Sequence, residues 1–296
     1  NPRMRAYFSE QIREFDPDVV ITSTDDPAQL LFGAALEAKR ARVAHLVRAT
    51  IAAPFGPDAS TPNAARAEAL RRADVVVGVS EYVARYVREF GGIPAVHVPI
   101  SLMETREPEL VARFDNSYVA FANPCAVKGI DIFLGLSDAL PELAFAAVPT
   151  WGTTTADLAE LRARANVTLL EPVEDMAELF RRTRVLLVPS IWAEARSRIV
   201  VEAMLHGVPV MASDVGGIPE AKLGVPYLLP VKQIRSYRAE VDENMAPVAE
   251  RPLQDIGPWV AALRRLVTDR AHWDEISRRS REAALKYVRE LDVGAF

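Results

Sequence analysis

The sequence has 296 residues, of which 50% are hydrophobic and 25% are charged, and its formal net charge is −5. That length suggests about two domains, and the composition is that of an ordinary soluble globular protein. The acidic balance argues against a nucleic-acid partner, because such a surface needs a basic face. No apolar run reaches the roughly 18 residues that a transmembrane helix needs, whereas peripheral contact with a membrane stays open.

The cysteine content and the start of the sequence give two further expectations. The single cysteine, Cys125, excludes an internal disulfide and favours a reducing compartment. No signal peptide is visible, so we expect a cytoplasmic protein. The first residue is Asn1 and the opening segment has a helical pattern, so we expect the chain to lack its natural N-terminus.

The first hundred residues alternate short apolar runs with segments of helical pattern. The run DVVITST is rich in β-branched residues, as a strand should be, and a helical stretch follows it. We expect strands at 18–24, 41–47, 74–80 and 95–100, and helices at 4–15, 27–41, 64–73 and 81–90.

A charged stretch with little strand signal, residues 101–116, separates this part from the rest and is typical of a connector. The alternation of strand and helix then resumes more completely. We expect strands at 118–123, 144–149, 166–171, 185–190, 209–213 and 226–230, and two final helices between Pro252 and Leu291.

Alternating helices and continuously apolar strands predict parallel sheets that are covered on both faces. We therefore expect an α/β protein with two doubly wound, Rossmann-like domains facing each other across a cleft, the first of them incomplete. The expected division is a partial domain at 1–100, the connector at 101–116 and a second domain at 117–296, whose last helix could pack back on the first. Ligands of such folds bind beyond the carboxyl ends of the strands.

Several other patterns have simpler explanations than catalysis. Asp16 and Asp18 precede a strand and so lie at the wrong edge of the sheet for a ligand. Ser80 in GVSEY lacks the second glycine of a nucleophile elbow and is better explained as a helix N-cap. The four histidines have no metal-ligand spacing, so no metal site is expected, and neither a GxGxxG nor a Walker A loop occurs.

Two glutamates, Glu194 and Glu202, lie eight positions apart after a predicted strand. Glu194 is expected in a loop, and Glu202 in the second turn of a helix that is apolar almost all round. A buried carboxylate needs a partner. That partner is either Arg198, four residues earlier, or a pair of ligand hydroxyls such as those of a ribose, and the spacing favours neither.

The same helix offers an anion site at its start. Ser197 can cap it, and its first free N–H groups would face the carboxyl edge of the sheet. Gly216 and Gly217 form a second strand-to-helix turn, which also suits a plain connection. Lys128 follows the first strand of this domain, although a surface lysine there needs no functional explanation. The three features together favour a site for a phosphorylated ligand.

The segment PSIWAEARSRIVVEAMLHGVPVMASDVGGIPE resembles the donor site of retaining glycosyltransferases of the GT-B fold, family four. Their pattern is a glutamate, seven residues, a second glutamate, Ala, Gly-x-Pro-Val and Gly-Gly-x-x-Glu. Here it is carried by Glu194, Glu202, Ala203, 207–210 and 216–220. The segments ADVVVGVSEYVARYV and VKGIDIFLGLSDALPE are similar to further parts of that family.

The resemblance implies a role for each matching residue. Glu202 would bind the ribose of a nucleotide-diphosphate sugar, and Glu194 would act at the transferred sugar as the catalytic carboxylate. The diphosphate would be held by Lys128 with Gly129 and by main-chain amides from Ser197 through Arg198 to Ile199. Main chain near Val173 would hold the base. No cofactor is implied, because the nucleotide-diphosphate sugar is the substrate.

The sequence also departs from the family pattern. Asn123 stands where the family usually has an arginine, five residues before Lys128, which removes a cation that Arg198 could replace. Ala195-Arg196-Ser197 replaces the usual Gly-Phe-Gly, and His45 and Arg48 both compete for the position of a family histidine. We expect a metal-independent, retaining hexosyltransferase whose acceptor is a carbohydrate, a lipid or a small molecule. A non-catalytic or partner-dependent nucleotide-sugar binding homologue and an epimerase of the same fold are the alternatives.

Overall fold

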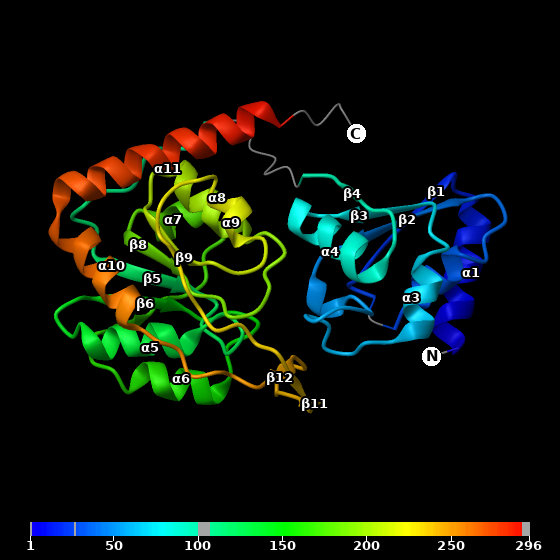
Figure 1. Cartoon of the computed structure of the whole chain (residues 1–296), viewed down its shortest axis with the longest axis horizontal. Coiled ribbons are helices and arrows are strands. Elements are labelled where there is room, and N and C mark those ends of the chain that lie inside the picture. Colours follow the sequence, from blue (N-terminus) through cyan, green and yellow to red (C-terminus); the bar gives the residue numbers. More distant parts are fainter. Residues whose placement is uncertain (1, 27, 100–106, 292–296) are drawn as a thin grey trace. The chain divides into compact units, whose positions relative to one another are not determined.

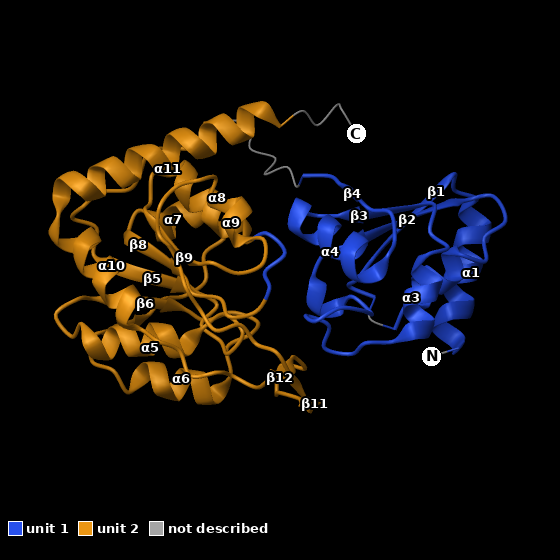
Figure 2. Ribbon diagram, viewed as in Figure 1, with its two compact units in different colours: residues 1–100, 193–196, 296 blue, residues 101–192, 197–295 orange. Residues whose placement is uncertain are grey.

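The computed structural model describes residues 2–26, 28–99 and 107–291. Within them, the chain divides into two compact units (Figure 2). Unit 1 holds residues 2–99 together with the short segment 193–196, and unit 2 holds residues 107–192 and 197–291. The expected connector at 101–116 lies partly outside the described residues, and its described part belongs to unit 2.

Unit 1 is a four-stranded parallel sheet whose strands follow one another in chain order, β1-β2-β3-β4. Right-handed crossovers that always step in one direction place their helices on one face of a sheet. Val20, Val43 and Val76 face that side and pack in one cluster with Phe32 and Val83 from the helices. The elements are α1 (Pro2–Phe15), β1 (Val19–Ser23), α2 (Leu30–Ala35), β2 (Arg42–Val47), α3 (Ala64–Leu70), β3 (Val75–Gly78), α4 (Glu81–Gly91) and β4 (Val96–His97).

Unit 2 has a six-stranded parallel sheet in the order β10-β9-β8-β5-β6-β7. The order reverses between β5 and β8, so helices cover both faces, and the crevice at such a reversal is where ligands bind in doubly wound folds. Figure 1 shows α5 and α6 below this sheet and α8, α9 and α11 above it. The strands are β5 (Tyr118–Ala122), β6 (Phe145–Val148), β7 (Val167–Leu169), β8 (Thr183–Val188), β9 (Val210–Ser213) and β10 (Leu228–Leu229). The helices are α5 (Ile130–Ala139), α6 (Thr155–Arg162), α7 (Met176–Phe180), α8 (Arg198–Leu205), α9 (Ile218–Ala221), α10 (Gly257–Thr268) and α11 (Arg270–Glu290).

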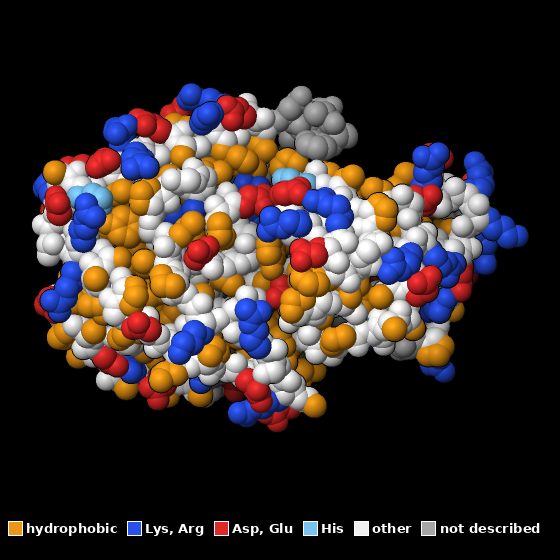
Figure 3. Space-filling view, viewed as in Figure 1, with side chains coloured by type: hydrophobic (Ala, Val, Ile, Leu, Met, Phe, Trp, Pro, Cys, Tyr) orange, Lys and Arg blue, Asp and Glu red, His pale blue; other side chains and the backbone are white. Residues whose placement is uncertain are grey.

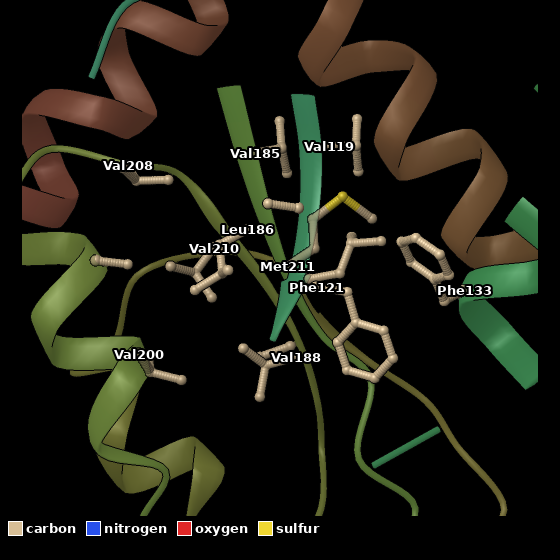
Figure 4. Packing of buried hydrophobic residues seen from close by; sticks show 14 of the residues in the cluster. Val119, Phe121, Phe133, Val185, Leu186, Val188, Val200, Val208, Val210 and Met211 are labelled. Atoms are coloured by element: carbon tan, nitrogen blue, oxygen red, sulfur yellow. The ribbon is translucent and has the colours of Figure 1, made fainter. Parts of the chain in front are cut away.

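The core of unit 2 explains why its central strands are apolar without alternation. Val119 and Phe121 on β5, Val185 and Leu186 on β8, and Val210 on β9 are all buried (Figure 4). Side chains on opposite faces of these strands are buried alike because helices lie on both sides. Each such side chain contributes about 1.5–3 kcal/mol through burial, which holds the strand ends in fixed positions for a site.

Most of the predicted elements are confirmed, with differences at their ends. All ten expected strands are found, and the last two expected helices are α10 and α11, with α11 packed on α8. The helix expected over 27–41 is limited to α2 in the described residues, and Gln29 before it has a left-handed backbone, with φ at 53°. An antiparallel hairpin, β11 (Tyr237–Val241) and β12 (Pro247–Ala249), was not predicted.

The surface mixes charges of both signs. On the face drawn in Figure 3, basic and acidic side chains lie among one another over both units. Many of them form exposed ion pairs, such as Arg278 with Glu282 at 2.8 Å. In the described parts of the chain, no helix combines the length and the apolar character that crossing a bilayer requires.

Candidate functional site

The loops after β5 and β8 are locked together at the point where the strand order of unit 2 reverses. Ile191 and Trp192 donate their backbone N–H groups to the carbonyl of Val127, at 3.0 and 3.3 Å. Gly129 has φ at +83°, and a Cβ there would lie 1.9 Å from the carbonyl oxygen of Pro189, so only glycine fits. The two loops therefore approach each other backbone to backbone.

Lys128 lies in this locked region. It is half-buried, and its Nζ lies 5.1 Å from the ring centroid of Trp192, a distance at which a cation is attracted to the ring face. The loop contacts thus place one ammonium group at the carboxyl end of β5, beside the loop that follows β8.

Asn123 ends β5 and supports a neighbouring loop. Its φ is 59°, a left-handed conformation that asparagine tolerates better than most residues. Its side chain is buried, and the amide oxygen accepts a hydrogen bond from the N–H of Gly152 at 3.1 Å. The residue at the family's arginine position thus holds the 150–152 turn, and a role for Asn123 in donor binding stays a prediction.

Helix α8 is buried along most of its surface and carries Glu202 at its edge. Val200, Val201 and Met204 are fully buried, whereas 23% of the Glu202 side chain is exposed. Arg198 donates to Glu202 at 3.1 Å, so the ion pair that the spacing allowed is formed. With the Arg side chain 59% exposed, such a pair stabilises the helix by only a few tenths of a kcal/mol.

The prediction that the Ser197 side chain caps α8 is wrong. Ser197 occupies the N-cap position, but its hydroxyl makes no capping hydrogen bond. Its backbone has φ 22° and ψ 81°, whereas a capping side chain needs an extended backbone to reach the N–H groups of the first turn. The carbonyl of Ser197 does accept from the N–H of Val200 at 3.1 Å, and the N–H groups at the start of a helix have no partner within it.

A cavity of about 250 Å³ opens within unit 2 beside Glu202. It joins α8 to the segment after β7, which includes the main chain that the resemblance assigns to the nucleotide base. Val173, the residue named for that role, directly precedes this lining and packs on the core. The lining consists of Pro108, Glu174, Asp175, Met176, Ala177, Phe180, Arg198, Glu202, Leu205 and His206.

Some of these lining residues were not predicted. Asp175 accepts from the N–H of Ala177 at 2.9 Å and so caps α7, which fixes the cavity wall. His206 contacts the carbonyl of Glu109 through Nδ1 at 2.8 Å, and its ring lies 5.3 Å from that of Phe180. Asp175 could have been recognised as an N-cap in the sequence, whereas the contact of His206 with Glu109 joins residues 97 positions apart.

Glu194 is separated from Glu202 by the division into units. Residues 193–196 belong to unit 1, and Glu194 is 6% exposed. The hydroxyl of Ser80 donates to the carbonyl of Ala195 at 2.6 Å, and that of Thr50 donates to the carbonyl of Ala193 at 3.4 Å. Glu194 is thus buried in a four-residue segment of unit 1, although the chain on either side of that segment belongs to unit 2.

His45 is a buried residue of β2. Its Nδ1 lies 2.8 Å from the hydroxyl of Thr22, and its ring packs against Phe32. Burial lowers its pKa to about 4, although the charge of Asp26 opposes this shift. The ring is therefore neutral at physiological pH. Arg48, the competing candidate, is paired with Asp25.

The described residues contain no group of three His, Cys, Asp or Glu side chains that could hold a metal ion. Among the described residues of unit 2, one basic side chain is buried. Lys222 is fully buried and donates to the carbonyl of Val210 at 2.6 Å. Burial lowers its pKa to about 7.

Comparison with known proteins covers both units. Residues 118–244 match the model of a family described as glycosyl transferases group 1, and residues 1–99 match one described as glycosyltransferase family 4. An uncharacterized 42.6 kDa protein of a cps region in Klebsiella pneumoniae is 27% identical over 184 residues, which are 59% of this chain and 48% of that protein. The D-inositol 3-phosphate glycosyltransferase of Mycobacterium tuberculosis is 44% identical over 64 residues, which are 21% of this chain and 13% of that enzyme.

The chain therefore spans half or less of these curated relatives. Solved structures share its fold: a glycosyltransferase of Rickettsia africae has a TM-score of 0.64 at 14% identity, covering 96% of this chain and 76% of its own. HepE of Anabaena in complex with UDP-glucose has a TM-score of 0.71 at 14% identity, covering 97% and 80%. The two family matches and the shared fold lead to one assignment. The chain belongs to the group 1 glycosyltransferase family.

Proposed function

We propose that this protein transfers a hexosyl group from a nucleotide-diphosphate sugar to an acceptor hydroxyl, with retention of configuration and without a metal ion. The observation that carries the proposal is the cavity of about 250 Å³ in unit 2, where Glu202 and Arg198 meet residues 174–177. At about 250 Å³ it is slightly smaller than the roughly 300 Å³ at which small-molecule sites usually start, so it would hold the nucleoside part of the donor alone.

Glu202 is the proposed ligand of the ribose. A carboxylate can accept from two vicinal hydroxyls at once, and the ion pair with Arg198 at 3.1 Å orients the carboxylate of Glu202 beside the cavity. Main chain at Val173 would hold the base beside it. HepE, which shares the fold, has been crystallised with UDP and with UDP-glucose, which supports a donor of this chemical class.

The diphosphate would be bound by one cation and a helix start. Lys128 is placed by the locked loops around Gly129. The N–H groups from Ser197 to Ile199, which have no partner within the helix, and the dipole of α8 favour an anion. Arg198 is sufficiently exposed to reach a phosphate and to replace the cation that Asn123 does not supply.

The proposed reaction forms one bond and breaks one. The acceptor oxygen attacks the anomeric carbon, the bond from that carbon to the β-phosphate oxygen breaks, and the acceptor proton passes to the departing nucleoside diphosphate. Lys128 and the α8 amides stabilise the negative charge of the leaving group. Glu194 holds sugar hydroxyls and stabilises the positive charge that builds at the anomeric carbon.

The acceptor would be a carbohydrate, a lipid or a small molecule, and the reaction would take place in the cytoplasm. The single cysteine of the sequence, Cys125, is buried, which supports a reducing compartment.

The test is calorimetric titration of the chain with UDP, UDP-glucose and GDP-mannose, followed by release of nucleoside diphosphate from the donor that binds. Glu202→Gln should weaken the affinity at least tenfold. Glu282→Gln is the matched control, because it breaks another Arg–Glu pair of i,i+4 spacing, on α11. Binding without any release of diphosphate would favour the non-catalytic homologue. No binding of any donor, or equal affinity in Glu202→Gln, would refute the proposal.

A further inference from the structure

The segment that carries Glu194 is held on both sides by hydroxyl groups from the N-terminal part of the chain. The carbonyl of Ala195 accepts from Ser80 at 2.6 Å, and the carbonyl of Ala193 accepts from Thr50 at 3.4 Å. These carbonyls belong to the residues directly before and after Glu194. Two fixed points this close leave the backbone of Glu194 little freedom to move.

The hydroxyl group of Ser80 takes part in two hydrogen bonds. It is the N-cap of α4, where its oxygen accepts from the N–H of Val83 at 3.1 Å. Its proton is thereby left for Ala195. The residue is 0% exposed, so this hydrogen bond does not compete with water. Gly78 makes the position possible, because a Cβ there would lie 2.4 Å from the N–H nitrogen of Ala84.

Thr50 begins a loop that is itself fixed by two tyrosines of α4, the half-buried Tyr82 and the buried Tyr86. Tyr82 donates to Asp58 at 2.7 Å, and Tyr86 donates to the carbonyl of Phe55 at 3.0 Å while it accepts from the N–H of Asp58 at 3.0 Å. Burial raises the pKa of Tyr86 to about 12, so it remains a hydrogen-bond donor at any working pH. The anchor of Ala193 therefore rests on a rigid loop.

We propose that Ser80, assisted by Thr50, is the positioning residue that fixes Glu194 for sugar transfer. This inference rests on the proposed function, and it assigns donor binding to one unit and the positioning of the catalytic carboxylate to the other. Donor binding depends on Glu202 and Lys128 in unit 2, whereas the catalytic carboxylate is fixed by hydrogen bonds within unit 1. Loss of the Ser80 hydroxyl should thus reduce turnover without affecting the affinity for the donor.

Three substitutions of the full chain separate positioning from capping. Ser80→Gly removes the donor to Ala195, and glycine is a tolerable N-cap. Ser80→Thr keeps both hydrogen bonds. Asn63→Gly is the matched control, because Asn63 caps α3 in the same unit through the N–H of Arg66 and has no bond to 193–196. The probes are UDP for binding and UDP-glucose for diphosphate release, or the corresponding GDP pair if that donor binds.

We expect kcat to fall about 10- to 100-fold in Ser80→Gly, as misplacement of a catalytic group does. The Kd for UDP should stay within twofold, and hydrogen exchange should accelerate in a peptide that covers 193–196. Ser80→Thr and Asn63→Gly should retain kcat. Equal kcat in Ser80→Gly and the unmodified chain, or equal losses in Ser80→Gly and Asn63→Gly, would overturn the inference.

Two further readouts keep the test decisive. If Ser80→Gly does not fold, Thr50→Val decides, because it removes the other hydroxyl donor: a lower kcat with an unchanged Kd for UDP supports the anchor, and an unchanged kcat refutes it. If the unmodified chain binds no donor, the proposed function fails by itself, and comparing hydrogen exchange of 193–196 between the unmodified chain and Ser80→Gly still decides whether Ser80 holds the segment.

Discussion

Lys222 gives the sharpest prediction, because it is an amine that folding removes from water. The side chain is fully buried and donates to the carbonyl of Val210. Its pKa falls from the ordinary 10.5 to about 7, and the cause is burial. Between these two pH values the unfolded chain binds a proton that the folded chain does not, so the free energy of unfolding rises with pH. Below about pH 7 both states are protonated and the dependence disappears.

The magnitude follows from these two pKa values. Proton linkage at one such site raises the free energy of unfolding by about 2 kcal/mol between pH 7 and pH 9. Lys222→Met has no titrating group there, so the difference in stability between the unmodified chain and the variant should change by that amount. Effects that do not depend on pH, such as the lost hydrogen bond to Val210, cancel in this comparison.

Urea unfolding followed by tryptophan fluorescence measures this effect in the correct unit. All four tryptophans, Trp151, Trp192, Trp259 and Trp273, belong to unit 2, which also contains Lys222. Lys232→Met serves as the control, because it removes an exposed lysine of the same unit. Parallel pH profiles for the unmodified chain and Lys222→Met would refute the reasoning, since they would mean that the amine keeps its charge in the folded state.

Three further predictions test the loops, the first sheet and the chemistry. Gly129→Ala should unfold unit 2 or abolish UDP binding, because its Cβ would lie 1.9 Å from the Pro189 carbonyl oxygen. The control Gly224→Ala, with φ at +76° and nothing within 4 Å, should lower the free energy of unfolding in urea by only about 1–2 kcal/mol. Equal losses of stability in the two variants would contradict this. The ring of His45 should titrate near pH 4 by NMR. Because burial disfavours the charged ring, unit 1 should lose about 3 kcal/mol of stability as the pH falls from 6.5 to 4. Titration near pH 6.5 would show that the ring is not buried. Release of diphosphate should be equal with EDTA and with added magnesium, and loss of release in EDTA that magnesium restores would disprove metal independence.

The strands and the turn residues of this protein follow from local patterns. Continuous apolar runs such as 185–190 and 209–213 predict buried strands, and both are found as β8 and β9. Ser80 reads as an N-cap and is one. These features depend on a few neighbouring residues, so the local sequence is sufficient to predict them.

Among the contacts of the site residues, some follow from the local sequence and others do not. The pair of Arg198 and Glu202 is formed between residues four positions apart, and the sequence allowed it but could not choose it over a ligand. Ser197 was expected to cap α8 and does not, because its backbone, with φ 22° and ψ 81°, lacks the extended conformation of a capping residue. The hairpin of β11 and β12 was missed because its exposed strands lack the apolar pattern of the core.

What the sequence determined by itself was the parallel α/β fold, the family pattern around Glu194 and Glu202, and the glycine at 129. Tertiary structure alone decided that 193–196 joins unit 1, that Lys222 is buried, and that Glu202 borders a cavity with 174–177. The physical reason is the distance along the chain that separates the interacting residues. Strand, cap and turn preferences act between residues close in the chain, whereas the bond from Ser80 to Ala195 spans 115 positions and exists only once the chain has folded.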